Sequence, residues 1–209
     1  MKLLKKLAIS TLLFTVAGSA YAIPTLIDFK ADANLLERGY ASLNNYAGLK
    51  ITASSIFDNA GDTQQFAYMD SGNAGLGSCM DVTAGFQCTP SSDDNVTRGE
   101  SVHFVWDSNI VITGIWFNNN HDSDFSLLGD KISIEGDDYL FAAADFDASR
   151  SDFFYGTSRN VFMNNSFDIS YFSDQFYISA IEFETVPEPG ILALLSIGLI
   201  GLGVARCRK

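Results

Sequence analysis

The sequence contains few basic residues and almost no histidine, and this limits the partners that it can bind. It has 13 Lys and Arg, 2 His and 25 Asp and Glu in 209 residues, which gives a formal net charge of −12 at pH 7. Six of the basic residues lie in the first six and last four positions, so the stretch between them has seven bases against all 25 acids, a charge of about −18. A surface this acidic repels nucleic acids and anionic lipids. It favours divalent cations instead.

The sequence also lacks a long amphipathic helix pattern between residues 23 and 185. Short apolar runs recur there, separated by Gly, Asn, Asp and Ser, which is typical of an all-β sandwich or barrel. With 47% hydrophobic and 18% charged residues, the chain is not disordered by composition. We therefore predict one exported domain, residues 23–185, folded as a jelly-roll-like β-sandwich of about nine strands.

The expected strands follow from alternation and from turn residues. Alternation places Val102, Phe104 and Trp106 on one face of a strand. Gly114 predicts a bulge or strand junction, and Gly136-Asp137 has the glycine-first order of a type II′ hairpin turn. The expected elements are one short helix over 35–44 and strands over 25–29, 49–54, 65–70, 101–107, 110–117, 131–135, 138–142, 167–172 and 175–184.

No catalytic motif is present in the sequence. There is no G-x-S-x-G nucleophile elbow, and the glycines of residues 72–77 lack the G-x-G-x-x-G spacing of a nucleotide-binding loop. They predict a tight loop with positive φ angles. His103 lies within an alternating strand, which favours a structural or surface role. The sequence therefore does not indicate an enzyme.

The N-terminus has the three parts of a secretory signal peptide. Three lysines lie among the first six residues, residues 7–16 are apolar, and Ala20-Tyr21-Ala22 has the small-residue pattern of a cleavage site. We expect signal peptidase to cleave between Ala22 and the exported domain, which removes residues 1–22.

The C-terminus has a second pattern of three parts. Val186-Pro187-Glu188-Pro189 is followed by the apolar segment 190–205 and the basic residues 206–209. Proline lacks a backbone donor and keeps the preceding residue extended, so the motif stays accessible to a processing enzyme. As a helix the apolar segment would span about 24 Å, slightly less than the ~30 Å of a hydrocarbon core. The basic end then lies in the cytoplasm.

This tail resembles the PEP-CTERM sorting signal of Gram-negative bacteria, which membrane proteases called exosortases recognise. The resemblance implies export through the inner membrane, transient anchoring by a transmembrane helix over 190–205, and cleavage near the Pro-Glu-Pro motif. The protein would then reach the cell surface or the extracellular space. The alternative is a permanent inner-membrane anchor with the domain in the periplasm.

Two of the three cysteines lie in the exported part. Cys79 and Cys88 would meet an oxidising environment, so we expect a disulfide that closes a short loop. A metal site would need more Cys or His ligands than this neighbourhood contains. Cys207 lies in the basic end and would leave with the tail.

An acidic segment follows these cysteines. Asp93, Asp94, Asn95 and Glu100 carry the oxygen ligands that Ca²⁺ prefers, although no EF-hand pattern is present. We predict that at least three of these four side chains converge on one Ca²⁺ site. The alternative is that they cap turns through local hydrogen bonds.

Residues 68–100 also resemble, more loosely, exported domains attached to PEP-CTERM tails, which implies a β-sandwich without an assigned activity. Together with the tail, this implies a surface or extracellular-matrix protein that associates with exopolysaccharide and binds calcium or glycan. Trp116, Tyr139 and Tyr155 could stack against sugar rings, with packing in or around the core as the alternative. The alternative function is a secreted polysaccharide hydrolase, which needs two carboxyl groups about 5–9 Å apart in a cleft.

Overall fold

The computed structural model describes residues 23–46, 48–55, 63–121, 126–156 and 163–186, together with residue 198. Residues Pro24–Glu184 form one compact unit. The predicted signal peptide and the predicted transmembrane helix, residue 198 excepted, lie outside the described residues. Within the described ranges, every helix is too short or too polar to span a bilayer.

The unit is built almost entirely from β-strands, so the predicted all-β class is confirmed. The described residues also form a five-residue helix, α2 (Phe29–Ala33), and a 3₁₀ turn, η1 (Ala143–Asp145). The strands are β1 (Thr25–Asp28), β2 (Arg38–Tyr40), β3 (Leu43–Tyr46), β4 (Leu49–Ser55), β5 (Thr63–Asp70), β6 (Gly75–Cys79), β7 (Glu100–Asn118), β8 (Lys131–Ile134), β9 (Asp137–Leu140), β10 (Phe146–Asp147), β11 (Asp152–Gly156), β12 (Met163–Tyr171) and β13 (Tyr177–Thr185).

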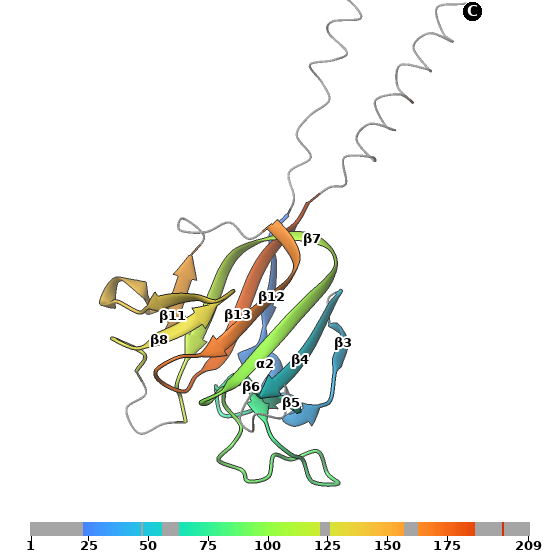
Figure 1. Cartoon of the computed structure of the whole chain (residues 1–209). Coiled ribbons are helices and arrows are strands. Elements are labelled where there is room, and N and C mark those ends of the chain that lie inside the picture. The colour runs from blue at the N-terminus through green and yellow to red at the C-terminus, as the bar shows by residue number, and fades with distance from the viewer. Residues whose placement is uncertain are drawn as a thin grey trace, which may run out of the picture. The chain divides into compact units, whose positions relative to one another are not determined.

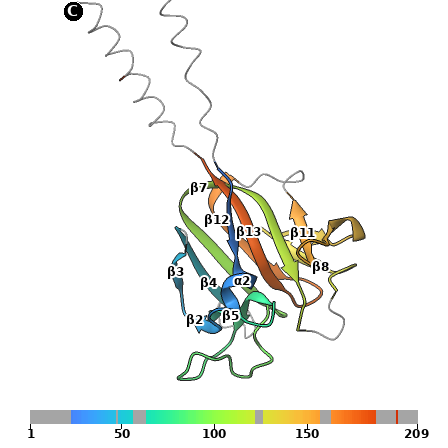
Figure 2. The same cartoon turned by 180° about the vertical axis from the view of Figure 1, so that it is seen from behind.

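The longest strand, β7, organises the sheet (Figure 1). Its first half pairs with β4 and β12, and its second half pairs with β11. The strand order is β1-β13-β6-β5-β4-β7-β12-β8-β9, and β13 also pairs with β7, so the sheet closes on itself. Seen from behind, β1 lies along β13 and leads into α2 (Figure 2). The jelly-roll-like sandwich stays a prediction.

The inward-facing residues of β7, β12 and β13 form much of the hydrophobic core. Phe104 and Trp106 are buried, as the alternation predicts. Phe167 stacks on both rings, with centroids 4.8 Å from Phe104 and 5.4 Å from Trp106, and Phe183 meets Trp106 edge-on at 5.4 Å. Such aromatic contacts stabilise beyond the area that they bury, by about 0.5–1.5 kcal/mol a pair.

The two strands expected over 101–107 and 110–117 are one continuous strand, because the burial alternation continues between them. Gly114 pairs with Gly156, the last pair of the β7–β11 register, and the burial alternation changes phase between Gly114 and Ile115. A Cβ at Gly114 would lie 2.5 Å from the Phe154 ring, so the glycine makes room for that ring. The register between β7 and β12 shifts between Val105 and Ile110 of β7, where β7 has more residues than the facing segment from Asn164 to Ser166.

The helix expected over 35–44 is wrong, since β2 and β3 occupy that stretch. Gly39 in β2 pairs with Tyr68 of β5, and a Cβ on it would lie 2.5 Å from Val82. These tertiary contacts override the local preference. The observed helix, α2, comes earlier and is capped by Asp28, whose side chain accepts a hydrogen bond from the backbone N–H of Ala31 at 2.9 Å.

Two predicted turns also differ. The β8–β9 hairpin turns at Glu135-Gly136, where φ is 54° and 81°. Positive φ at both central residues defines a type I′ turn rather than the expected type II′. The glycine loop over 72–77 does have positive φ at Gly72 and Gly75. Its second half, however, belongs to β6, which is buried between β5 and β13.

Candidate functional site

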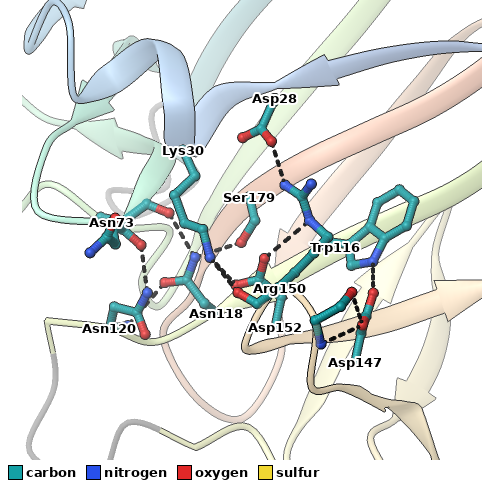
Figure 3. A network of polar contacts seen from close by, with 12 residues as sticks. Asp28, Lys30, Asn73, Trp116, Asn118, Asn120, Asp147, Arg150, Asp152 and Ser179 are labelled. Carbon is teal, nitrogen blue, oxygen red and sulfur yellow. Dashed lines mark hydrogen bonds and ion pairs between the residues drawn. The ribbon is translucent and has the colours of Figure 1, made fainter.

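A polar pocket of about 520 Å³ lies where α2 meets three turns (Figure 3). Lys30 comes from α2, Asn73 from the β5–β6 turn and Asn120 from the segment that follows β7, while Arg150 and Ser151 come from the turn before β11. Asn73 and Ser151 have φ of 68° and 58°, so both turns are tight. The sequence analysis did not predict this pocket, because its residues are widely separated along the chain.

The cationic side of the pocket is an ion-pair network. Lys30 Nζ lies 2.8 Å from Asp152 Oδ1 and also donates to the Arg150 carbonyl at 2.8 Å. Arg150 Nη2 donates to Asp28 Oδ2 at 2.8 Å, and its Nε lies 3.4 Å from Asp152 Oδ2. Asp152 is fully buried. Burial raises its pKa, while the hydrogen bond and charge of Lys30 oppose this. Two cations thus balance two carboxylates, and the network is neutral.

An aromatic ring extends this network. The Arg150 guanidinium lies 5.3 Å from the centroid of Trp116, a cation–π contact. Trp116 Nε1 donates to Asp147 Oδ2 at 3.0 Å. Hydrogen bonds from Ser149 and Trp116 lower the pKa of Asp147. These contacts hold the guanidinium in one orientation beside the pocket.

The carboxamides of Asn73 and Asn120 line the other side of the pocket, and the carboxamide of Asn118 lies behind them. The buried Asn118 donates to the Ala74 carbonyl at 2.7 Å and to Ser179 Oγ, and its Oδ1 accepts from the backbone N–H of Asn120 at 3.0 Å. Asn120 in turn donates to the Asn73 carbonyl. The described residues provide no hydrogen-bond donor to Oδ1 of Asn120. The arrangement therefore offers fixed donors and acceptors to a small polar ligand.

A second polar group involves the turn next to the pocket. Asp70 Oδ2 lies 2.7 Å from His121 Nδ1, and Tyr177 donates from its hydroxyl to Asp94 Oδ1 at 2.7 Å. Burial and then the charge of Asp94 raise the pKa of Asp70 to about 6. Burial also raises the pKa of Asp94, and the Tyr177 hydroxyl opposes that shift.

The predicted calcium ligands have separate hydrogen-bond partners in the described residues. Asp93 Oδ2 accepts from the backbone N–H of Met80 at 3.0 Å, and Glu100 Oε2 accepts from that of Thr97 at 2.9 Å. Asp94 faces Tyr177 instead, and the buried Asn95 has no partner for its Oδ1 among the described residues. The strands and turns that carry them direct these side chains to different neighbours. The convergence of three of them on one Ca²⁺ ion stays a prediction, as does calcium binding itself.

Cys79 and Cys88 form a disulfide with a Cα–Cα distance of 5.9 Å. Cys79 ends β6, and Cys88 forms an antiparallel bridge with Val82 across the intervening loop. Both cysteines are buried against Tyr68. The bond therefore closes the loop that precedes the acidic segment, which is where the sequence places it.

The predicted sugar-stacking residues do not share a platform. Tyr155 is buried in the core, and Tyr139 meets it edge-on with centroids 4.7 Å apart. Trp116 packs instead on Phe154, at 4.7 Å. His103 pairs with Asp168 on the adjacent strand β12, at the surface.

Comparison with known proteins addresses the end of the chain. Residues 185–209 match the family model of the PEP-CTERM protein-sorting motif. This range includes the predicted motif Val186, Pro187, Glu188 and Pro189, which lies largely outside the described residues.

The chain therefore carries a PEP-CTERM sorting motif, which indicates an exported protein that is targeted to exosortase. The motif indicates membrane anchoring before release to the surface or the extracellular space. Comparisons with curated proteins and with solved structures give no match.

Proposed function

We propose that this protein is a non-enzymatic surface or matrix protein that binds exopolysaccharide through the polar pocket. The observation that carries the proposal is the lining of the pocket, where Lys30 and Arg150 lie beside the carboxamides of Asn73 and Asn120. Ammonium and guanidinium groups donate to hydroxyl and carboxylate oxygens, and carboxamides both donate and accept. These are the groups that a polysaccharide presents.

The charge balance of the pocket supports an association with polymers that carry acidic sugars. The exported part has a charge of about −18 from seven bases and 25 acids, which repels anionic polymers over most of its surface. At the pocket, Lys30 and Arg150 offset Asp28 and Asp152. The volume of about 520 Å³ lies within the range of ligand pockets, roughly 300–1,000 Å³. We expect the pocket to hold a short stretch of the polymer.

The alternative, a polysaccharide hydrolase, has one observation in its favour. Asp70 and Asp94 have carboxylate oxygens within 4.8 Å of each other, and both pKa values are raised. A glycosidase needs both carboxyl groups to contact the substrate. Asp70 is only 4% exposed, and neither residue lines the pocket. The geometry therefore favours binding over hydrolysis.

The proposal is tested by measuring binding of residues 23–186 to acidic and neutral exopolysaccharides, with and without Ca²⁺. Asn120→Ala should weaken binding at least tenfold, because a fixed donor and acceptor are lost. Asn44→Ala is the matched control, since Asn44 is exposed and its side chain bonds only within its own turn, to Ser42. Lys30 is left intact, because removing it would leave the buried Asp152 without its closest cation.

Two results would contradict the proposal. One is that no exopolysaccharide binds the wild-type domain. The other is that Asn120→Ala binds as tightly as Asn44→Ala. Release of reducing sugar by the wild-type domain would instead favour the hydrolase.

Signal peptidase and exosortase are the processing partners that this proposal includes, together with cleavage after Ala22 and near Pro187–Pro189. Calcium is proposed as a second ligand, through Asp93, Asp94, Asn95 or Glu100 acting with other oxygen donors. A calcium-dependent rise of the melting midpoint, absent in chelator, is the expected sign of it.

A further inference from the structure

Three side chains from separate elements meet beside the β5–β6 turn. Asp70 ends β5, His121 follows β7, and Asp94 precedes the short bridge that Val96 forms with Phe176. One ligand atom from each of the three lies within 4.8 Å of the other two. Asp70 is buried, Asp94 is half-buried and the side chain of His121 is 36% exposed, so the group opens to solvent on one side.

One oxygen of the buried Asp70 carboxylate, Oδ2, lacks a hydrogen-bond partner among the described residues. Asp70 is 4% exposed, and no described residue donates a hydrogen bond to its Oδ2. His121 Nδ1 lies 2.7 Å from that oxygen, but outside hydrogen-bonding geometry. An unsatisfied buried carboxylate is costly. A cation between the oxygen and the imidazole nitrogen would provide the missing partner of Oδ2 and a ligand interaction for Nδ1, which is otherwise 3.5 Å from the Tyr177 hydroxyl.

The surroundings hold these ligands in place. Tyr177 is fully buried and donates to Asp94 Oδ1 at 2.7 Å, which fixes the plane of that carboxylate. Hydrogen bonds of this kind orient the ligands of metal sites. Gly72 leaves room for the imidazole, since a Cβ there would lie 2.7 Å from His121 Nε2. The ring therefore packs against backbone and presents Nδ1 to the two carboxylates.

The chemistry of the donors selects the ion. Calcium takes six to eight oxygen ligands, whereas this group offers one imidazole nitrogen and two carboxylates. Imidazole with carboxylate suits Zn²⁺ and neighbouring divalent transition metals. Zn²⁺ has ligand bonds of about 2.0–2.2 Å, so its ligand atoms lie about 3.3 Å apart. That spacing requires only small movements of side chains that already lie this close.

We propose that Asp70, Asp94 and His121 bind one divalent transition-metal ion of the Zn²⁺ class, with a solvent molecule in the open position. The two carboxylates repel each other, and a dication removes that repulsion. The site is independent of the proposed polysaccharide binding, because none of its three ligands lines the pocket. The ion would join the end of β5 to the end of β7 and to the acidic segment.

The test uses the full chain, purified in detergent and stripped of metal with a chelator. Zn²⁺ is titrated in competition with a chromophoric chelator, and Co²⁺ is used as a spectroscopic probe of the coordination. We expect one equivalent of Zn²⁺ to bind. His121→Asn should lower the affinity at least tenfold, and because His121 is exposed this variant should keep the fold. Asp70→Asn should do the same, and Tyr177→Phe should cost about 10–100-fold.

The matched control is His103→Asn. His103 is the other histidine of the sequence and also faces an aspartate, Asp168, but no third ligand joins them among the described residues. This variant should bind Zn²⁺ like the wild type. The proposal is overturned if the wild type binds no Zn²⁺, if His121→Asn binds as tightly as the wild type, or if His103→Asn loses as much affinity. Near-ultraviolet circular dichroism checks that each variant is folded.

Discussion

Glu100→Gln should stabilise the exported domain at neutral pH. Glu100 begins β7 and is 3% exposed. Burial raises its pKa from 4.5 to about 7, although the hydrogen bond from the Thr97 backbone N–H opposes the shift. The ionised carboxylate is therefore unfavourable in the folded state. Glutamine keeps an acceptor for Thr97 and carries no charge.

The sign of the pH dependence follows from the two protonation states. Below pH 4.5, Glu100 is protonated in both the folded and the unfolded chain, and it contributes nothing to the pH dependence. Between pH 4.5 and about 7 the folded chain keeps the proton that the unfolded chain has released, so the free energy of unfolding falls as pH rises. Above about pH 7 the carboxyl group is ionised in both states, so the loss of unfolding free energy no longer changes with pH. At ~1.4 kcal/mol for each pKa unit it amounts to about 3 kcal/mol.

Urea unfolding between pH 5 and pH 8 measures this effect, with the buried Trp106 as the fluorescent reporter. The advantage of Glu100→Gln over the wild type should be small at pH 5 and about 3 kcal/mol at pH 8. Asp70, whose pKa is also raised, contributes in the same direction but is present in both proteins. Asp138→Asn, an exposed substitution, should leave the curve unchanged. Parallel curves for the wild type and Glu100→Gln would refute the reasoning.

Three further predictions concern the loop and the tail. Reduction of the Cys79–Cys88 bond should lower the free energy of unfolding by about 2–3 kcal/mol, because the loop is short; urea curves with and without reductant measure this, and no change would contradict it. Gly77→Ala should destabilise by about 1–3 kcal/mol or more, because its Cβ would lie 2.0 Å from the Asp94 carbonyl oxygen. Gly85→Ala is the control, since its nearest atom is 3.7 Å away, and equal melting midpoints would exclude the clash. Mass spectrometry of the surface-associated protein should find a C-terminus without the basic tetrapeptide, and an intact tail would indicate a permanent anchor.

Local patterns predicted the parts of the fold that local forces decide. Alternation in the first half of β7 identified that strand and its inward face, because a strand with one buried side must alternate. The PEP-CTERM tail was predictable for a different reason. A sorting enzyme reads it as a linear signal, so its order and spacing are sufficient.

Elements whose conformation depends on distant partners were missed. β2 and β6 contain glycines and few branched residues, and they are strands because β5 pairs with both of them. Gly77 in β6 lies against the backbone of Asp94, and no sequence pattern predicts this contact. The same contact explains why Asp93 and Asp94, adjacent in sequence, have different partners. Neighbouring acids suggested one calcium site, but the sequence did not indicate that Asp93 would accept from Met80 and Asp94 from Tyr177.

The sequence by itself determined the all-β class, the acidic charge and the address carried by the C-terminus, because composition, period and linear motifs need no partner. The tertiary structure alone decided the polar pocket and the Asp70–Asp94–His121 group. Lys30 lies 120 residues from Arg150, and the two meet only because β1 pairs with β13 and β11 pairs with β7. Sites of this kind arise from sheet closure, which brings together side chains that have no relation in sequence.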